Sequence, residues 1–140
     1  MQDLHERNRK NIEEFRANGG KIGGGFTGAP LLLLTTTGAR SGKPYTTPVM
    51  YLPDGDRLAV FASKGGAPTH PDWYHNLVAH PTVTLEVGTD TFEAHASVAT
   101  GEERDKLFAR QAELYPQFAE YQKKTSRQIP VVVLQRVGSR

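Results

Sequence analysis

The feature that most constrains the fold is a series of short β-prone segments joined mainly by turn signals. Asp54-Gly55 separates one pair of segments and Gly88-Thr89-Asp90 separates another, and such turns join antiparallel hairpins. The segments do not alternate one for one with long helices, which argues against a doubly wound parallel sheet. We therefore predict an α+β domain built on a mostly antiparallel, barrel-like sheet. The six expected strands are Leu31–Thr37, Tyr45–Leu52, Arg57–Ser63, Thr82–Val87, Thr91–Ala99 and Ile129–Val137.

Helices are expected at the N-terminus and between some of the strands, over residues 3–17, 71–79, 101–114 and 116–123. The first of these segments places Leu4, Ile12 and Phe15 on one apolar face and stops at a glycine pair. Thr100 with Glu103 three residues later resembles a capping box for the third helix. Two prolines, at positions 44 and 48, are expected at a strand start or an unpaired edge.

A chain of 140 residues is long enough for one domain with a real core, and 37% hydrophobic with 23% charged residues is typical of globular proteins. We assign residues 1–30 to a helix and a glycine-rich lead-in and residues 31–140 to the barrel. The absence of cysteine excludes disulfides and thiol catalysis. No apolar run approaches the roughly 18 residues of a membrane span. We expect a cytoplasmic protein whose contact with membranes is at most peripheral.

The distribution of charge is more informative than the net charge of +2. Between Leu31 and Pro53 the chain carries Arg40 and Lys43 but no acidic residue. A second loop repeats this chemistry, with Lys64 beside a glycine pair whose bare backbone permits close approach. Two cationic loops at strand ends create a local positive potential. They predict a binding site for an elongated anion.

Several other sites are excluded by context. The segment Gly23–Gly28 matches G-x-G-x-x-G but follows a helix and precedes a strand, which is the reverse of a dinucleotide fold. The run "GARSGKP" lacks the spacing and the magnesium-binding hydroxyl of a P-loop. Three histidines spaced by five do not converge on a helix, so no metal site is expected. Ser41 lacks a nucleophile-elbow motif, and the cations are too few to indicate nucleic-acid binding.

Three stretches carry a family resemblance: "TTTGARSGKPYTTPVMYL", "FASKGGAPTHPDWYHNL" and "NLVAHPTVTLEVG". Together they resemble the deazaflavin-dependent nitroreductase family, a branch of the flavin/deazaflavin oxidoreductases, over about Leu31 to Val137. The resemblance implies a split β-barrel of the FMN-binding type. It also implies coenzyme F420, an 8-hydroxy-5-deazaflavin with an anionic tail, as the cofactor.

The resemblance also implies which residues bind this cofactor. The phosphate and tail positions match a cationic loop and a lysine with its glycine pair: Arg40, Ser41, Gly42, Lys43, Lys64, Gly65 and Gly66. The ring positions match the edge of the second strand, the end of the third strand and the following helix: Thr47, Pro48, Val49, Met50, Ala62, Ser63, Trp73 and Asn76.

The substrate positions implied by the resemblance are Met50, Tyr115, Phe118 and Tyr121. Nitroreductases of the family have tyrosines where this chain has Met50 and Phe118, so reduction of bulky nitroimidazoles is not expected. The implied reaction is hydride transfer from reduced F420 to a quinone, a conjugated enone or a similar electron-poor acceptor. Ser63 is expected to polarise the acceptor or bind the ring, and Tyr115 or Tyr121 to assist protonation.

Two alternatives remain open: an FMN-dependent oxidoreductase on the same barrel, and a non-catalytic carrier of a deazaflavin or lipid. The sequence leaves the oligomeric state open between a monomer and a homodimer.

Overall fold

The computed structural model describes residues 4–20 and 30–137. The glycine-rich segment Gly23–Gly28 and residue 3 of the expected first helix lie outside this range, as does the side chain of Leu4. In chain order the helices are α1 (Leu4–Ala17), the short 3-10 turn η2 (Lys64–Gly66), α2 (Asp72–Ala79), α3 (Gly101–Leu114) and α4 (Gln117–Lys124). The strands are β1 (Leu31–Thr37), β2 (Pro44–Asp54), β3 (Arg57–Phe61), β4 (Thr82–Val87), β5 (Asp90–Val98) and β6 (Val131–Arg136).

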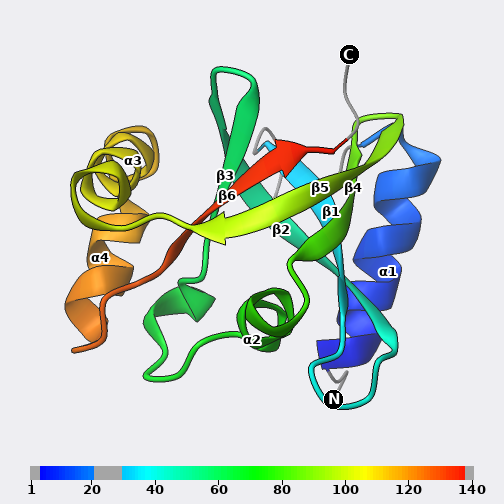
Figure 1. The fold of residues 1–140 in the computed structure, drawn as a ribbon, viewed down its shortest axis with the longest axis horizontal. Coiled ribbons are helices and arrows are strands. Elements are labelled where there is room, and N and C mark those ends of the chain that lie inside the picture. The colour runs from blue at the N-terminus through cyan, green and yellow to red at the C-terminus, as the bar shows by residue number, and fades with distance from the viewer. Residues whose placement is uncertain (1–3, 21–29, 138–140) are drawn as a thin grey trace.

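The six strands form one closed antiparallel barrel in the order β1-β2-β3-β6-β5-β4 (Figure 1). Both predicted hairpins are present, with Asp54 opposite Arg57 and Val87 opposite Asp90. The predicted fold class is therefore confirmed, and most strand ends differ from prediction by one or two residues. No helix in the described part of the chain is long and apolar enough to cross a membrane.

Strand β2 changes partner part-way along its length. Its first seven residues, Pro44–Met50, pair with β1, whereas Tyr51–Asp54 pair with β3. The Tyr51 N–H donates toward the β1 side, to Pro30 O at 3.1 Å. Because backbone polar groups alternate along a strand, those of Thr46, Pro48 and Met50 point away from β1. The missing N–H of Pro48 thus falls on the edge that has no strand partner in the described register, in agreement with prediction.

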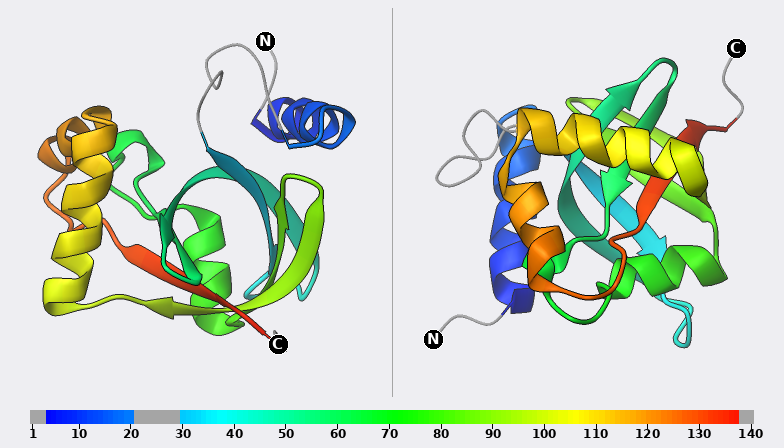
Figure 2. Two further views of the ribbon diagram at one scale, coloured as in Figure 1. Left: turned by 90° about the horizontal axis from the view of Figure 1, so that it is seen from above. Right: turned by 90° about the vertical axis from the view of Figure 1, so that its left-hand side faces the viewer.

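Strand β1 is buried on both faces, which explains its unbroken run of leucines. Leu32 and Leu34 point into the barrel, where they pack with Val60, Leu85 and other core residues. The alternate residues Leu31 and Leu33 pack outward against Phe15 of α1. A third cluster lies between the barrel and α3 and α4, on the opposite side from α1 (Figure 2).

The start of α3 corrects one prediction. The helix begins at Gly101 as expected, but the Thr100 side chain makes no capping hydrogen bond. Gly101 adopts a positive φ of 58° there, which glycine tolerates at little cost. Glu103 instead forms an ion pair with Arg57 at 3.1 Å, across to β3. The acidic first turn, with Glu102 and Glu103, still complements the helix dipole.

Candidate functional site

A groove of about 1480 Å³ runs along the unpartnered edge of β2. Residues from α1, the β1–β2 loop, the loop after β3, α2 and α4 line it. Twelve of the predicted site residues lie in its wall: Arg40, Ser41, Thr47, Pro48, Val49, Met50, Ser63, Lys64, Trp73, Asn76, Phe118 and Tyr121. Five others do not: Gly42, Lys43, Ala62, Gly66 and Tyr115. Gly65 belongs to η2.

The β1–β2 loop is a tight turn held by its own polar groups. Gly38 N–H donates to Lys43 O at 2.7 Å, and Gly42 N–H donates to Gly38 O at 3.0 Å. Ser41 Oγ lies so close to Gly38 that a Cβ at this position would collide with it. Ser41 Oγ also accepts from Lys43 N–H and lies 3.2 Å from the Tyr45 hydroxyl. Ser41 therefore shapes the turn and has a hydroxyl at the groove.

Asn76 of α2 fixes this loop to the body of the barrel. Its Oδ1 accepts from Ala39 N–H at 3.0 Å, and its Nδ2 donates to Thr36 Oγ1 at 3.2 Å. The side chain is 9% exposed, so both bonds form in a protected environment. Trp73, one turn earlier in α2, is buried to the same degree and packs with the barrel core. In this structure Asn76 acts as a tether for the loop that presents Arg40.

The cations of the loop have no local compensation. Neither Arg40 nor Lys43 has a side-chain hydrogen bond or ion pair within the described ranges, and both are exposed. Arg40 lines the groove, whereas Lys43 lies outside its wall. An unpaired guanidinium beside a groove attracts phosphate or carboxylate groups and can bind them in a bidentate manner.

The loop after β3 brings a second cation to the groove. Lys64 adopts a positive φ of 47°, which is unusual for a residue with a side chain, and its Nζ donates to Thr69 Oγ1 at 3.3 Å. Gly66 has a φ of 86° and faces α4, where an added Cβ would lie 2.8 Å from Tyr121 O. Gly66 therefore allows close packing of η2 on α4. Ala62 is fully buried, and its N–H donates to Pro130 O, so it offers the groove no exposed atom.

Two aromatic residues of α4 also line the groove. Phe118 is 5% exposed, and its ring packs edge-on against Phe61 and Tyr121, with centroid distances of 5.8 and 5.3 Å. Tyr121 is only partly buried and lines the groove. Tyr115 precedes α4 and packs on the outer cluster between barrel and helices. Tyr121 packs on this cluster too, so it is the groove lining that separates the two tyrosines that the sequence treated as equivalent.

Sequence reasoning allowed that the first helix packs over the pocket but named none of its residues in the site, and it missed one supporting residue. Helix α1 contributes Arg9, Ile12, Glu13 and Arg16 to the groove wall. Arg16 forms a bidentate pair with Glu86 of β4, at 2.9 and 2.8 Å, which fixes α1 to the barrel. The amphipathic pattern of α1 gave no sign that its polar residues would border a groove. The supporting residue is Arg127, in the loop between α4 and β6, and no local motif marks it.

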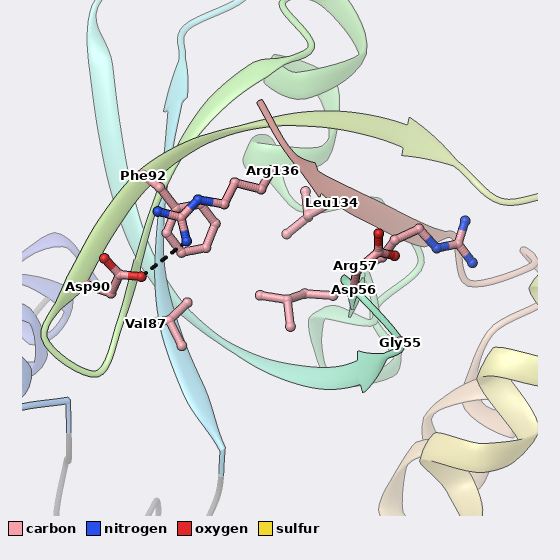
Figure 3. A pocket seen from close by; sticks show the side chains of 9 residues that line it. Gly55, Asp56, Arg57, Val87, Asp90, Phe92, Leu134 and Arg136 are labelled. Atoms are coloured by element: carbon pink, nitrogen blue, oxygen red, sulfur yellow. Dashed lines mark hydrogen bonds and ion pairs between the residues drawn. The ribbon is translucent and has the colours of Figure 1, made fainter. Parts of the chain in front are cut away.

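A second, smaller pocket of about 250 Å³ lies at the end of the barrel formed by the β2–β3 and β4–β5 turns (Figure 3). It shares no lining residue with the groove. The Arg136 guanidinium lies over the Phe92 ring at 4.4 Å and pairs with Asp90 at 3.3 Å (Figure 3). Arg57, at its rim, is paired with Asp54 and Glu103. Both cations are neutralised, so this pocket does not favour an anion.

The described residues contain no group of three or more histidine, cysteine, aspartate or glutamate side chains that could hold a metal ion.

Comparison with known proteins gives a consistent result. The model of the F420H(2)-dependent quinone reductase family matches residues 7–136. An F420H(2)-dependent quinone reductase of Mycobacterium tuberculosis is 43% identical over 128 residues, which cover 87% of this chain and 85% of the relative. A solved F420-H2 dependent reductase (FDR-A) is 44% identical with a TM-score of 0.70, over 76% of this chain and 94% of the other.

Two further solved structures bear on assembly and fold. One, described as a domain-swapped dimer, is 38% identical with a TM-score of 0.72, and the match covers 92% of this chain and 95% of that one. The other, a putative pyridoxamine 5'-phosphate oxidase from Listeria innocua, is only 13% identical. Its TM-score of 0.57, over 96% of this chain and 94% of the other, supports a shared split-barrel fold alone.

Proposed function

Because this chain belongs to the F420H(2)-dependent quinone reductase family, we propose that it transfers hydride from reduced coenzyme F420 to a quinone, and that the groove along β2 is the site. The observation that carries this placement is the groove itself, whose wall includes both an unpaired guanidinium and aromatic side chains. A long cofactor with an anionic tail and a flat ring needs both features.

The residues present fit such a cofactor. Arg40 and Lys64 supply positive charge from two separate loops, and Ser41 adds a hydroxyl beside Arg40. The groove wall also contains two carboxylates, Glu13 and Asp72. Glu13 is paired with Arg9 at 3.0 Å and therefore does not oppose an anion with a full charge, whereas Asp72, in the first turn of α2, has no ion pair in the described ranges. In this proposal Gly42 and Lys43 shape the turn and its field, and Gly65 and Gly66 support Lys64.

The ring of the cofactor is assigned to the edge of β2. Thr47, Pro48, Val49 and Met50 line the groove where β2 has no second strand partner, so its outward backbone groups are available to a ligand. Ser63, 8% exposed, faces the same space. Trp73 closes it from α2. Ala62 supports Ser63 from the core.

The cofactor supplies the chemistry, because a reduced deazaflavin donates hydride as a two-electron reagent. The protein binds and orients the cofactor and the acceptor. In this proposal Met50, Phe61 and Phe118 exclude water from the acceptor side of the groove. Ser63 Oγ can donate to an acceptor oxygen, and the Tyr121 hydroxyl is the nearer of the two proposed proton donors because its residue borders the groove. Tyr115 supports α4 through the outer cluster. The apolar residues at positions 50 and 118 favour a quinone over a polar nitroaromatic acceptor.

The proposal is tested by the steady-state rate at which the protein oxidises reduced F420 with menadione as the acceptor. The same rate is measured with reduced FMN in place of reduced F420. Turnover with F420 supports it, whereas turnover with FMN alone would favour the flavin alternative. Binding of F420 without turnover on quinone or enone acceptors would favour a carrier. Absence of F420 binding at micromolar concentration would refute the site. The finer question of monomer or homodimer is answered on the same sample by sedimentation, since a relative is described as a domain-swapped dimer.

A further inference from the structure

We infer that Arg127 is a positioning residue for the loop that carries Ser63 and Lys64, and that it sets how this loop meets the cofactor. The inference rests on the proposed function, which assigns both side chains to the F420 site. It concerns a residue outside the groove wall that acts through other residues.

The Arg127 guanidinium makes four polar contacts, all within residues 62–70. Its Nη1 donates to Ala62 O at 3.1 Å, its Nη2 donates to Ser63 O at 2.9 Å, and its Nε donates to Ala67 O at 3.0 Å. Nη1 also lies 2.9 Å from His70 Nδ1. A guanidinium has five N–H donors in a rigid plane, so it can fix several acceptors in relation to each other at once. One side chain therefore determines the course of the loop after β3.

The loop needs such support because its conformation is strained at Lys64. A residue with a side chain at φ 47° costs roughly 1–2 kcal/mol relative to the right-handed region. The turn itself contributes two local backbone bonds, from Gly66 N–H to Ser63 O and from Ala67 N–H to Lys64 O, besides the exposed side-chain bond of Lys64 to Thr69. Strained backbone persists where its surroundings determine it. The contacts of Arg127 on both sides of Lys64 hold the backbone in this conformation.

Arg127 is itself held by groups away from the groove. Gln122 Nε2 of α4 donates to Arg127 O at 2.8 Å, while Gln122 Oε1 accepts from Arg104 Nη2 and Ile129 N–H, both at 3.0 Å. Burial lowers the pKa of Arg127 below its ordinary value, yet an arginine stays charged. In the described ranges it has no carboxylate partner within ion-pair distance, so the carbonyl oxygens of the loop balance its charge.

His70 makes this arrangement sensitive to protonation. To accept from Arg127, Nδ1 must be unprotonated, so the neutral ring carries its hydrogen on Nε2. The His70 ring also faces Tyr74 and His75 of α2, at centroid distances of 4.7 and 5.7 Å. Burial lowers the pKa of His70, and the nearby Arg127 and His75 lower it further. Protonation of Nδ1 would remove an acceptor and place two cations in contact.

A double-mutant cycle tests the inference, with the dissociation constant of F420 measured by fluorescence titration. Arg127→Met should raise this constant about tenfold, because loss of the contacts lets the loop leave its strained conformation. In a Lys64→Ala background the same change should have an effect at least about threefold smaller, since its main target is gone. Arg110→Met, a control on α3 outside the groove wall, should leave the constant within about twofold.

The outcomes separate the two levels of the argument. An equal effect of Arg127→Met in both backgrounds, or none in either, would overturn the positioning role. If Lys64→Ala and Arg40→Ala both leave F420 affinity unchanged, the proposed cofactor site itself is wrong. Should Arg127→Met fail to fold by circular dichroism, Arg127→Lys keeps the charge but not the planar fork. It should fold and bind F420 with intermediate affinity, and wild-type affinity for this variant would also overturn the role.

A pH profile gives a readout that lost packing alone would not move. His70→Asn retains an acceptor near the Nδ1 position but cannot be protonated. The ratio of the wild-type to the His70→Asn dissociation constant should rise as pH falls below 6.5, the ordinary His pKa. The cofactor's own ionisation cancels in this ratio. A ratio that stays constant from about pH 8 to about pH 5 would contradict the link between His70 and Arg127.

Discussion

Replacement of Gly66 by alanine tests the packing of η2 on α4. Gly66 has a φ of 86°, and a Cβ there would lie 2.8 Å from Tyr121 O and 3.0 Å from Lys124 Cβ. The left-handed backbone alone costs about 1 kcal/mol for alanine. Because the closest atom belongs to the backbone of a helix, relief of the clash requires movement of η2 or α4, which adds about 1–3 kcal/mol. We expect Gly66→Ala to lower the free energy of unfolding by about 2–4 kcal/mol in urea denaturation.

The matched control is Gly55→Ala in the β2–β3 turn. Its φ of 63° imposes a similar backbone cost, but a Cβ there meets nothing within 4 Å. The control should lower the free energy of unfolding by about 1 kcal/mol. Equal losses for the two variants, within about 0.5 kcal/mol and with unchanged m-values, would refute the close contact between η2 and α4.

Three further predictions concern the groove and its supports. Arg40→Ala should raise the F420 dissociation constant about tenfold, and the loss should shrink at high salt; fluorescence titration at two ionic strengths measures both effects. Asn76→Ala removes two hydrogen bonds in a protected site and should lower the free energy of unfolding by about 1–3 kcal/mol in urea denaturation. A variant as stable as the wild type would contradict the role of Asn76 as a tether of the β1–β2 loop. The pKa of His70 is lowered in the folded protein, so the unfolded chain binds the extra proton more readily. Stability should therefore fall as pH drops from 6.5 toward the lower folded pKa, and His70→Asn should lessen this loss in melts at several pH values.

Local signals in the sequence predict the elements well. Asp54-Gly55 and the turn at residues 88–90 define two hairpins, and the bounds of Leu31–Thr37 and Gly101–Leu114 agree with prediction. These features depend on neighbouring residues only. The capping box at Thr100 was the exception, because Gly101 reaches the helix through a positive φ and Glu103 finds a distant partner in Arg57.

The candidate site was harder to predict because its parts come from distant segments. The cationic pair Arg40 and Lys64 stood out through charge and glycine, and both lie at the groove. The contribution of α1 depends on long-range contacts, the packing of Phe15 on β1 and the pair of Arg16 with Glu86. Arg127 contacts residues about sixty positions earlier, and its segment carries no pattern that distinguishes a partly buried arginine with several acceptors from a solvated one.

The change of partner along β2 determines which kind of ligand its free edge can bind. A strand segment with one vacant side behaves as an acceptor for another strand, and many proteins bind peptides by this kind of augmentation. Here Pro48 removes a donor from that side, which discourages a second chain from docking along it. The free edge therefore offers a short row of backbone N–H and C=O groups in fixed positions. Such a row suits a rigid heterocycle that has complementary hydrogen-bonding groups along one side.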